Sequence, residues 1–201
     1  MHSPRYTVID QVKDSDHCVP VTSFKGWQIQ AYNIMQSNSW PLNMASHRVN
    51  LVYDERGGIG KYTFVKSLLM MDSRRFLIIH CNHDGIRIED LAKEARAAKE
   101  RGWNGDSCII VAVLEGLDSD SCRALEMAIE GLTIVKYEAR FAEYWQPVNV
   151  WVFTRHAPNL LSSIASAWKI YKVEKKSQGT IPDMREISFI DSLELFCSMP
   201  N

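Results

Sequence analysis

A glycine-rich loop between a predicted strand and a predicted helix most constrains what this chain can fold into. Residues 49–53 form a β-branched and aromatic run, and apolar residues recur at helical spacing from Phe64 to Leu69. Between them lies the sequence DERGGIGKYT, residues 54–63. Strand, glycine loop and helix is the arrangement in which backbone N–H groups and a helix N-terminus bind phosphate. The sequence therefore predicts a phosphate-binding loop.

The loop departs from the complete pattern G-x-x-x-x-G-K-[ST] at both ends. In that pattern glycines let the backbone wrap the phosphates, the lysine neutralises charge and the hydroxyl binds Mg²⁺. Asp54 replaces the first glycine and Tyr62 replaces the metal-binding hydroxyl. We expect an acidic side chain facing the phosphates and a metal that has lost a ligand. The remnant nucleotide-binding residues are Gly57, Gly58, Gly60, Lys61 and Thr63, although one extra residue turns the Thr63 hydroxyl about 100° around the helix.

Helical and strand patterns alternate along the rest of the chain. They predict helices over 27–36, from the loop to 71, over 89–101 and over 118–130, and strands over 76–80, 108–114, 133–137, 148–153 and 169–173. This order indicates an α/β fold, a three-layer sandwich with a mostly parallel central sheet. We expect an extended N-terminal arm over 1–23, a domain over 24–174 that opens with a helical segment over 24–46, and a C-terminal tail over 175–201. The tail turns amphiphilic from 187 to 196, as expected of a segment that packs back or docks on a partner.

Composition restricts the compartment and the partners. The 201 residues carry a formal net charge of −1, so nucleic acid would have to bind a local patch. Five scattered cysteines favour a reducing compartment. No apolar run is long enough to span a membrane, and the first 25 residues resemble neither a secretory signal nor a transit peptide. We expect an intracellular protein that is not secreted; cytosol, nucleus and organelle all stay open.

Several ordered blocks of sequence accompany the loop. They are Gly26-Trp27-Gln28, His47-Arg48, residues 57–61, the apolar strand 109–114, Gly131 with Lys136-Tyr137-Glu138, residues 150–153 with Ala157-Pro158, and residues 168–171. In this order, they make residues 24–174 resemble the superfamily 3 helicase domain of replication initiator (Rep) proteins from circular single-stranded DNA viruses, satellites and plasmids. The resemblance implies a P-loop NTPase-like, AAA+-like fold. The family's endonuclease domain has no counterpart in the 26 residues before Trp27, so we expect no origin nicking.

By resemblance, such a domain binds ATP and Mg²⁺ between the subunits of a ring, usually a hexamer, and moves along single-stranded DNA. That chemistry needs two carboxylates after the buried strand, a polar sensor and an arginine from a neighbouring subunit. The carboxylates fall on Ala112 and Val113, and Glu115 lies too far along to replace them. The sensor asparagine falls on Arg155. The Asp-Arg pair falls on Ser166-Ala167.

These losses predict a pseudo-ATPase with no catalytic residue and no metal site. Removal of one transition-state group typically costs about 10²-fold to 10⁵-fold in rate, and four such groups are absent together. Binding is a weaker demand than hydrolysis, because the glycines and Lys61 can still cradle an anion. ATP with Mg²⁺ thus stays open as a ligand, while no cofactor is required.

Three further groups of residues have plain structural explanations beside functional ones. Residues 80–84 gather potential metal ligands but lack a second pair to complete a site, so polar residues at a strand end are the favoured interpretation. Lys136 and Arg140, beside an aromatic residue, suit contact with single-stranded nucleic acid or a solvated strand end equally well. Trp103 and Trp145 lie beside polar residues and are candidates for a protein contact.

Two classes of function remain open. The favoured one is a degenerate Rep helicase-like domain kept as a non-hydrolysing structural or scaffolding subunit of a larger assembly, with protein partners and with nucleic acid as an open component. The alternative is a divergent ATP-dependent helicase or replication subunit that is active with partner chains. A homo-oligomeric ring fits the first class poorly. A third idea, a dominant-negative regulator that co-assembles with an intact Rep, requires an active relative in the same cell.

Overall fold

The computed structural model describes residues 5–13, 17–37, 49–81, 86–104, 107–112, 118–129, 149–156, 159–161, 165–174 and 180–197. The strands are β1 (Tyr6–Val8), β2 (Val49–Tyr53), β3 (Phe76–Cys81), β4 (Ser107–Ala112), β5 (Asn149–Thr154), β6 (Trp168–Glu174) and β7 (Asp183–Ile187). The α-helices are α1 (Trp27–Ser37), α2 (Lys61–Met71), α3 (Ile88–Glu100), α4 (Ser119–Ile129) and α5 (Phe189–Cys197). Short 3₁₀ turns lie at Val21–Ser23 and Ala165–Ala167.

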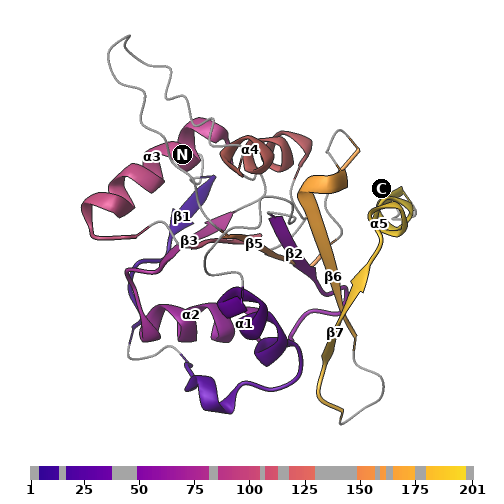
Figure 1. Ribbon diagram of the computed structural model, residues 1–201, viewed down its shortest axis with the longest axis horizontal. Helices are drawn as coiled ribbons and strands as arrows, with labels where there is room; N and C mark the ends of the chain where they lie inside the picture. Colours follow the sequence, from indigo (N-terminus) through magenta and orange to yellow (C-terminus); the bar gives the residue numbers. More distant parts are fainter. Residues whose placement is uncertain are drawn as a thin grey trace.

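All these strands join one sheet, in the order β1-β3-β4-β5-β2-β6-β7. The five inner strands run parallel, whereas β1 and β7 pair antiparallel at the two edges. Figure 1 shows the twisted sheet across the middle of the molecule. Because β2 pairs with both β5 and β6, the loop that follows β2 leaves the sheet from an interior strand.

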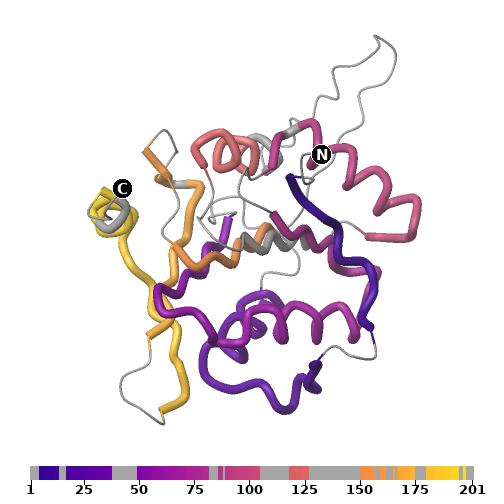
Figure 2. The backbone as a smooth tube through the Cα atoms, turned by 180° about the vertical axis from the view of Figure 1, so that it is seen from behind, coloured from indigo at the N-terminus to yellow at the C-terminus, as the bar shows by residue number. Residues whose placement is uncertain are grey.

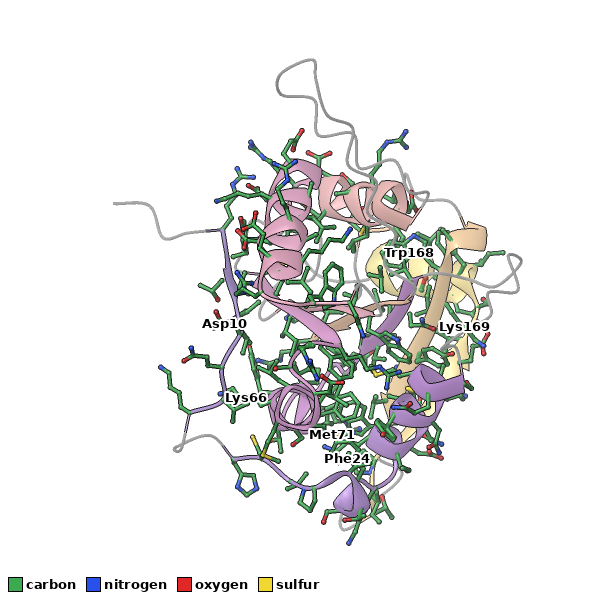
Figure 3. All side chains as sticks on the ribbon, turned by 60° about the vertical axis from the view of Figure 1, so that its left-hand side comes forward. Asp10, Phe24, Lys66, Met71, Trp168 and Lys169 are labelled. Atoms are coloured by element: carbon green, nitrogen blue, oxygen red, sulfur yellow. The ribbon has the colours of Figure 1, made fainter. Side chains whose placement is uncertain are left out.

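Helices cover both faces of the sheet. The α1 and α2 helices lie on one face, and α3 and α4 lie on the other, as Figure 2 shows from behind. Alternate residues of β2 therefore enter two separate cores: Val52 packs with Phe64 and Trp27, whereas Leu51 packs with residues of α3 and α4. In Figure 3, Phe24 and Trp168 mark these two sides of the sheet. An interior strand buried on both faces explains why four of the five residues at 49–53 are apolar or aromatic, with Asn50 the exception.

The mixed α/β architecture with a mostly parallel sheet is as predicted, and most predicted elements are confirmed within one or two residues. The predicted strand at 133–137 and residues 113–114 lie outside the described part of the chain. The short edge strands β1 and β7 were not predicted. Both belong to the same sheet as the inner strands, so the sheet extends beyond residues 24–174 into the predicted arm and tail.

The amphiphilic tail packs back on the domain. Phe189 and Leu193 of α5 lie against the core on the α3 and α4 side. Ile190 is exposed on the same helix. The structure thus shows the first of the two roles predicted for this segment.

Candidate functional site

The glycine loop lies at the carboxyl end of β2 and leads directly into α2. In open α/β sheets, ligands bind at the carboxyl ends of parallel strands. Gly60 precedes the first residue of α2 and has a φ of 83°, a left-handed conformation that favours glycine. Lys61 begins the helix, and Thr63 lies in its first turn. The predicted strand, loop and helix are therefore confirmed, and the five remnant residues lie together in one short stretch.

The side chain of Asp54 turns inward and binds the lysine of its own loop. Its Oδ2 lies 3.2 Å from Lys61 Nζ, and its Oδ1 accepts a 3.1 Å hydrogen bond from the backbone N–H of Arg56. The two paired side chains are 3% and 12% exposed, for Asp54 and Lys61 respectively. The sequence predicted that this acid would face the phosphates. Instead, its carboxylate pairs with the Lys61 ammonium group, which a bound phosphate would need as its own partner.

Burial and neighbouring charges act in opposite directions on Lys61. Burial lowers the pKa of its ammonium group, because the charged form loses hydration, and nearby Arg155 lowers it further. The charge of Asp54 and its hydrogen bond raise that pKa. Asp54 is thus the group that favours the protonated lysine in a site which otherwise disfavours a cation.

Tyr62, in the first turn of α2, contacts a histidine of β3. Tyr62 Oη lies 3.0 Å from Nε2 of His80, at the end of β3, and the two rings meet edge to face. Burial raises the pKa of Tyr62 to about 12 and lowers the pKa of His80. At neutral pH both groups are uncharged, so the pair offers a divalent cation no anionic ligand.

Two side chains, one aromatic and one basic, contact the loop. Trp27 is buried, and its Nε1 donates a 3.1 Å hydrogen bond to the carbonyl of Ile59. The Arg155 side chain packs over Gly57, since a Cβ added there would lie 3.4 Å from Arg155 Nε. Arg155 brings positive charge to the loop; that it replaces a sensor asparagine stays a prediction.

A groove of about 300 Å³ runs beside the loop. One wall is the loop itself, with Gly57, Gly58 and Ile59; the other is formed by the end of β6 and by Pro182. At its rim, Lys172 Nζ lies 2.9 Å from a carboxylate oxygen of Glu55. The lining thus contains one such pair, and it also contains the side chain of Arg56.

No family model, curated protein or solved structure matches this chain.

Some of the remaining sequence predictions concern described residues, and others do not. Ala112 ends β4; that it replaces a catalytic carboxylate stays a prediction. Val113, Glu115, Lys136, Arg140 and Trp145 lie outside the described residues. Over the described ranges, no three His, Cys, Asp or Glu side chains gather as a metal site. In that same part of the chain, every helix is too short or too polar to cross a bilayer.

The prediction that Trp103 contacts a partner is wrong for the chain as folded. Trp103 is 6% exposed and packs in the core on the α3 side, where its Nε1 donates to the carbonyl of Arg75 at 3.2 Å. Its polar sequence neighbours suggested exposure. Those neighbours are exposed in fact, because the turn after α3 points them outward while the indole turns in.

Sequence reasoning also missed two polar contacts of the core. Glu126 of α4 accepts a buried 2.6 Å hydrogen bond from Trp168 Nε1, and Trp27 reaches across to Ile59. Each joins residues at least 32 positions apart in the chain. The only local signal was a tryptophan, a residue that usually finds a partner for its N–H when buried.

Proposed function

We propose that this chain is a degenerate P-loop domain that serves as a non-hydrolysing structural or scaffolding subunit of a larger assembly. The strand, glycine loop and helix at the carboxyl end of an interior parallel strand support descent from a phosphate-binding fold. The resemblance of residues 24–174 to Rep helicase domains supports the same origin. What the domain has lost is the chemistry.

One observation carries the proposal: the buried ion pair between Asp54 and Lys61. A triphosphate entering the loop has to displace the Asp54 carboxylate or share the ammonium with it. Either outcome is costly, because the displaced carboxylate stays near the phosphates and like charges repel strongly at low dielectric. The Lys61 ammonium group thus has an anionic partner without a ligand.

Hydrolysis makes further demands that the described residues do not meet. Mg²⁺ needs oxygen ligands and the attacking water needs a base, yet Tyr62 is bound to His80 and β4 ends in Ala112. A domain without the groups for hydrolysis still has a surface that partner chains can bind. Exposed apolar side chains on separate elements, such as Met70 on α2 and Ile190 on α5, offer contacts for partner chains.

Nucleotide titration tests the proposal. We expect isothermal calorimetry to detect no binding of Mg·ATP by the wild-type protein at millimolar concentration, and no phosphate release with or without single-stranded DNA. Asp54→Gly restores the family glycine and frees Lys61, so its affinity for inorganic triphosphate rises at least tenfold. Glu186→Gln is the matched control, because it removes the acid of an exposed pair with Lys169, outside the groove, and leaves the Asp54 pair intact; its affinity stays at the wild-type level.

Turnover by the wild-type protein that Lys61→Ala abolishes would overturn the proposal and favour the alternative, a divergent ATP-dependent helicase subunit. The scaffolding role has its own test. Isolation of the native complex is expected to yield stable association with other chains at fixed stoichiometry. A free homohexamer that hydrolyses ATP would point back to a ring motor.

A further inference from the structure

Both walls of the groove beside the loop are held by the first turn of α1. The strands β6 and β7 form an antiparallel hairpin, and the wall that contains the end of β6 and Pro182 is here called the hairpin wall. The backbone N–H of Trp27 donates a 2.9 Å hydrogen bond to the carbonyl of Pro182 on this wall. The indole N–H of the same residue donates to the carbonyl of Ile59, on the loop wall, at 3.1 Å. One residue thus connects the loop to the segment that begins β7.

A second contact strengthens the hairpin side. Gln30, one turn further along α1, accepts a 2.9 Å hydrogen bond from the backbone N–H of Met184 in β7. Gln30 thus pairs with one backbone group of this edge strand, an N–H that also donates a 3.0 Å hydrogen bond to Asp183 Oδ1.

The approach of the two segments leaves no space for a side chain at Gly26. A Cβ there would lie 2.0 Å from the carbonyl oxygen of Pro182, and Gly26 has a φ of 53°. Glycine is therefore required for both space and backbone conformation. The α1 clamp, which we define as Gly26, Trp27 and Gln30, is a built contact and not a loose surface touch.

Trp27 itself has little freedom to move. It is 1% exposed, and its ring centroid lies 5.1 Å from that of Phe64 in α2 and 5.9 Å from that of Phe153 in β5. Because the indole is fixed in the core, the loop and the hairpin are both hydrogen-bonded to the same immobile residue. Displacement of either wall breaks a hydrogen bond to it or shifts it in a close-packed site.

From these contacts we infer that the α1 clamp couples the conformation of the glycine loop to that of the β6–β7 hairpin. The hairpin leads through Ser188 directly into α5. A ligand or partner chain that moves one wall of the groove therefore changes the other wall and the base of α5. The proposed coupling does not involve nucleotide. An experiment that refutes it therefore leaves the proposed loss of hydrolysis unaffected, and the reverse also holds.

Hydrogen–deuterium exchange with two reciprocal variants tests the coupling. Trp27→Phe removes the indole donor and keeps an aromatic ring, and Gln30→Ala removes only the hairpin contact. We expect each variant to raise exchange about fivefold both in the loop, residues 54–60, and in residues 181–187; this factor corresponds to the loss of one net hydrogen bond. Trp103→Phe is the matched control, because it deletes the same donor at a buried tryptophan away from the groove and leaves both segments at wild-type exchange.

The reciprocal variant decides the outcome. If Gln30→Ala accelerates exchange in residues 181–187 while the loop stays at the wild-type rate, the coupling is refuted. A Trp27→Phe protein that unfolds globally raises exchange everywhere and leaves the decision to Gln30→Ala, whose side chain is only partly buried.

Discussion

Two ion pairs, each between a carboxylate and a basic side chain, lie in contrasting surroundings at the carboxyl ends of neighbouring strands. The Asp54–Lys61 pair follows β2 and is almost fully buried. The Arg185–Glu174 pair joins β7 to β6 at 3.3 Å, with side chains 67% and 39% exposed. The first pair lies in the glycine loop, whereas in the second Glu174 lines the groove beside the loop and Arg185 lies on the edge strand β7. The two pairs therefore differ both in position and in burial.

The contrast also explains why the loop is stable without a ligand. A buried cation needs a partner, and Asp54 supplies one from within the loop. Water already serves that purpose for the exposed pair, so its two charges gain little from each other. Three measurements test whether the buried and the exposed pair differ in their contribution to stability.

The largest effect is expected from Asp54→Ala, which leaves Lys61 buried without its counter-ion. Removing one partner of a buried pair costs about 3–5 kcal/mol. Urea denaturation monitored by tryptophan fluorescence measures this loss of unfolding free energy, and inorganic triphosphate restores part of it by supplying a new anion. A loss below about 1 kcal/mol would place the Asp54–Lys61 pair in the same class as the exposed one.

A smaller effect is expected in the pH dependence of stability at alkaline pH. The folded pKa of Lys61 lies below its ordinary value of 10.5. Between these two values the unfolded chain binds more protons, so the lysine makes the unfolding free energy rise with pH, by at most about 1.4 kcal/mol per pH unit.

The tyrosines oppose this trend, because burial raises the pKa of Tyr53 and of Tyr171 and their ionisation favours the unfolded chain above pH 10. The comparison with Lys61→Met isolates the lysine. The wild-type curve minus the Lys61→Met curve is expected to rise as pH approaches 10.5; a flat difference contradicts the lowered pKa.

The smallest effect is expected from Glu174→Gln, which breaks the exposed pair. Such pairs contribute between 0 and about 1 kcal/mol, and salt screens them. Unfolding at low and at high salt is expected to show a loss within this range that shrinks as salt is added. A loss that matches Asp54→Ala would remove the distinction between the two pairs.

Local patterns in the sequence were sufficient for most of the fold. The helix over 27–37 and the helix over 88–100 were predicted within two residues, because helical spacing of apolar residues is visible in a short window. The loop was found from Gly60, Lys61 and its flanking elements. The short edge strands β1 and β7 were not, since three to five residues of mixed polarity carry no clear period and form only by pairing with β3 and β6.

The chain by itself determined that a glycine loop joins a buried strand to a helix; the loss of groups for metal binding and hydrolysis stays a prediction. Only the tertiary structure decided that Asp54 turns toward Lys61 and that Trp27 holds both walls of the groove. Side-chain direction and partner choice depend on residues far apart in the chain: Trp27 contacts Ile59 and Pro182 in the folded protein, although neither is near it in the sequence. Composition and spacing are local properties, whereas a contact between distant segments is a property of the packed core.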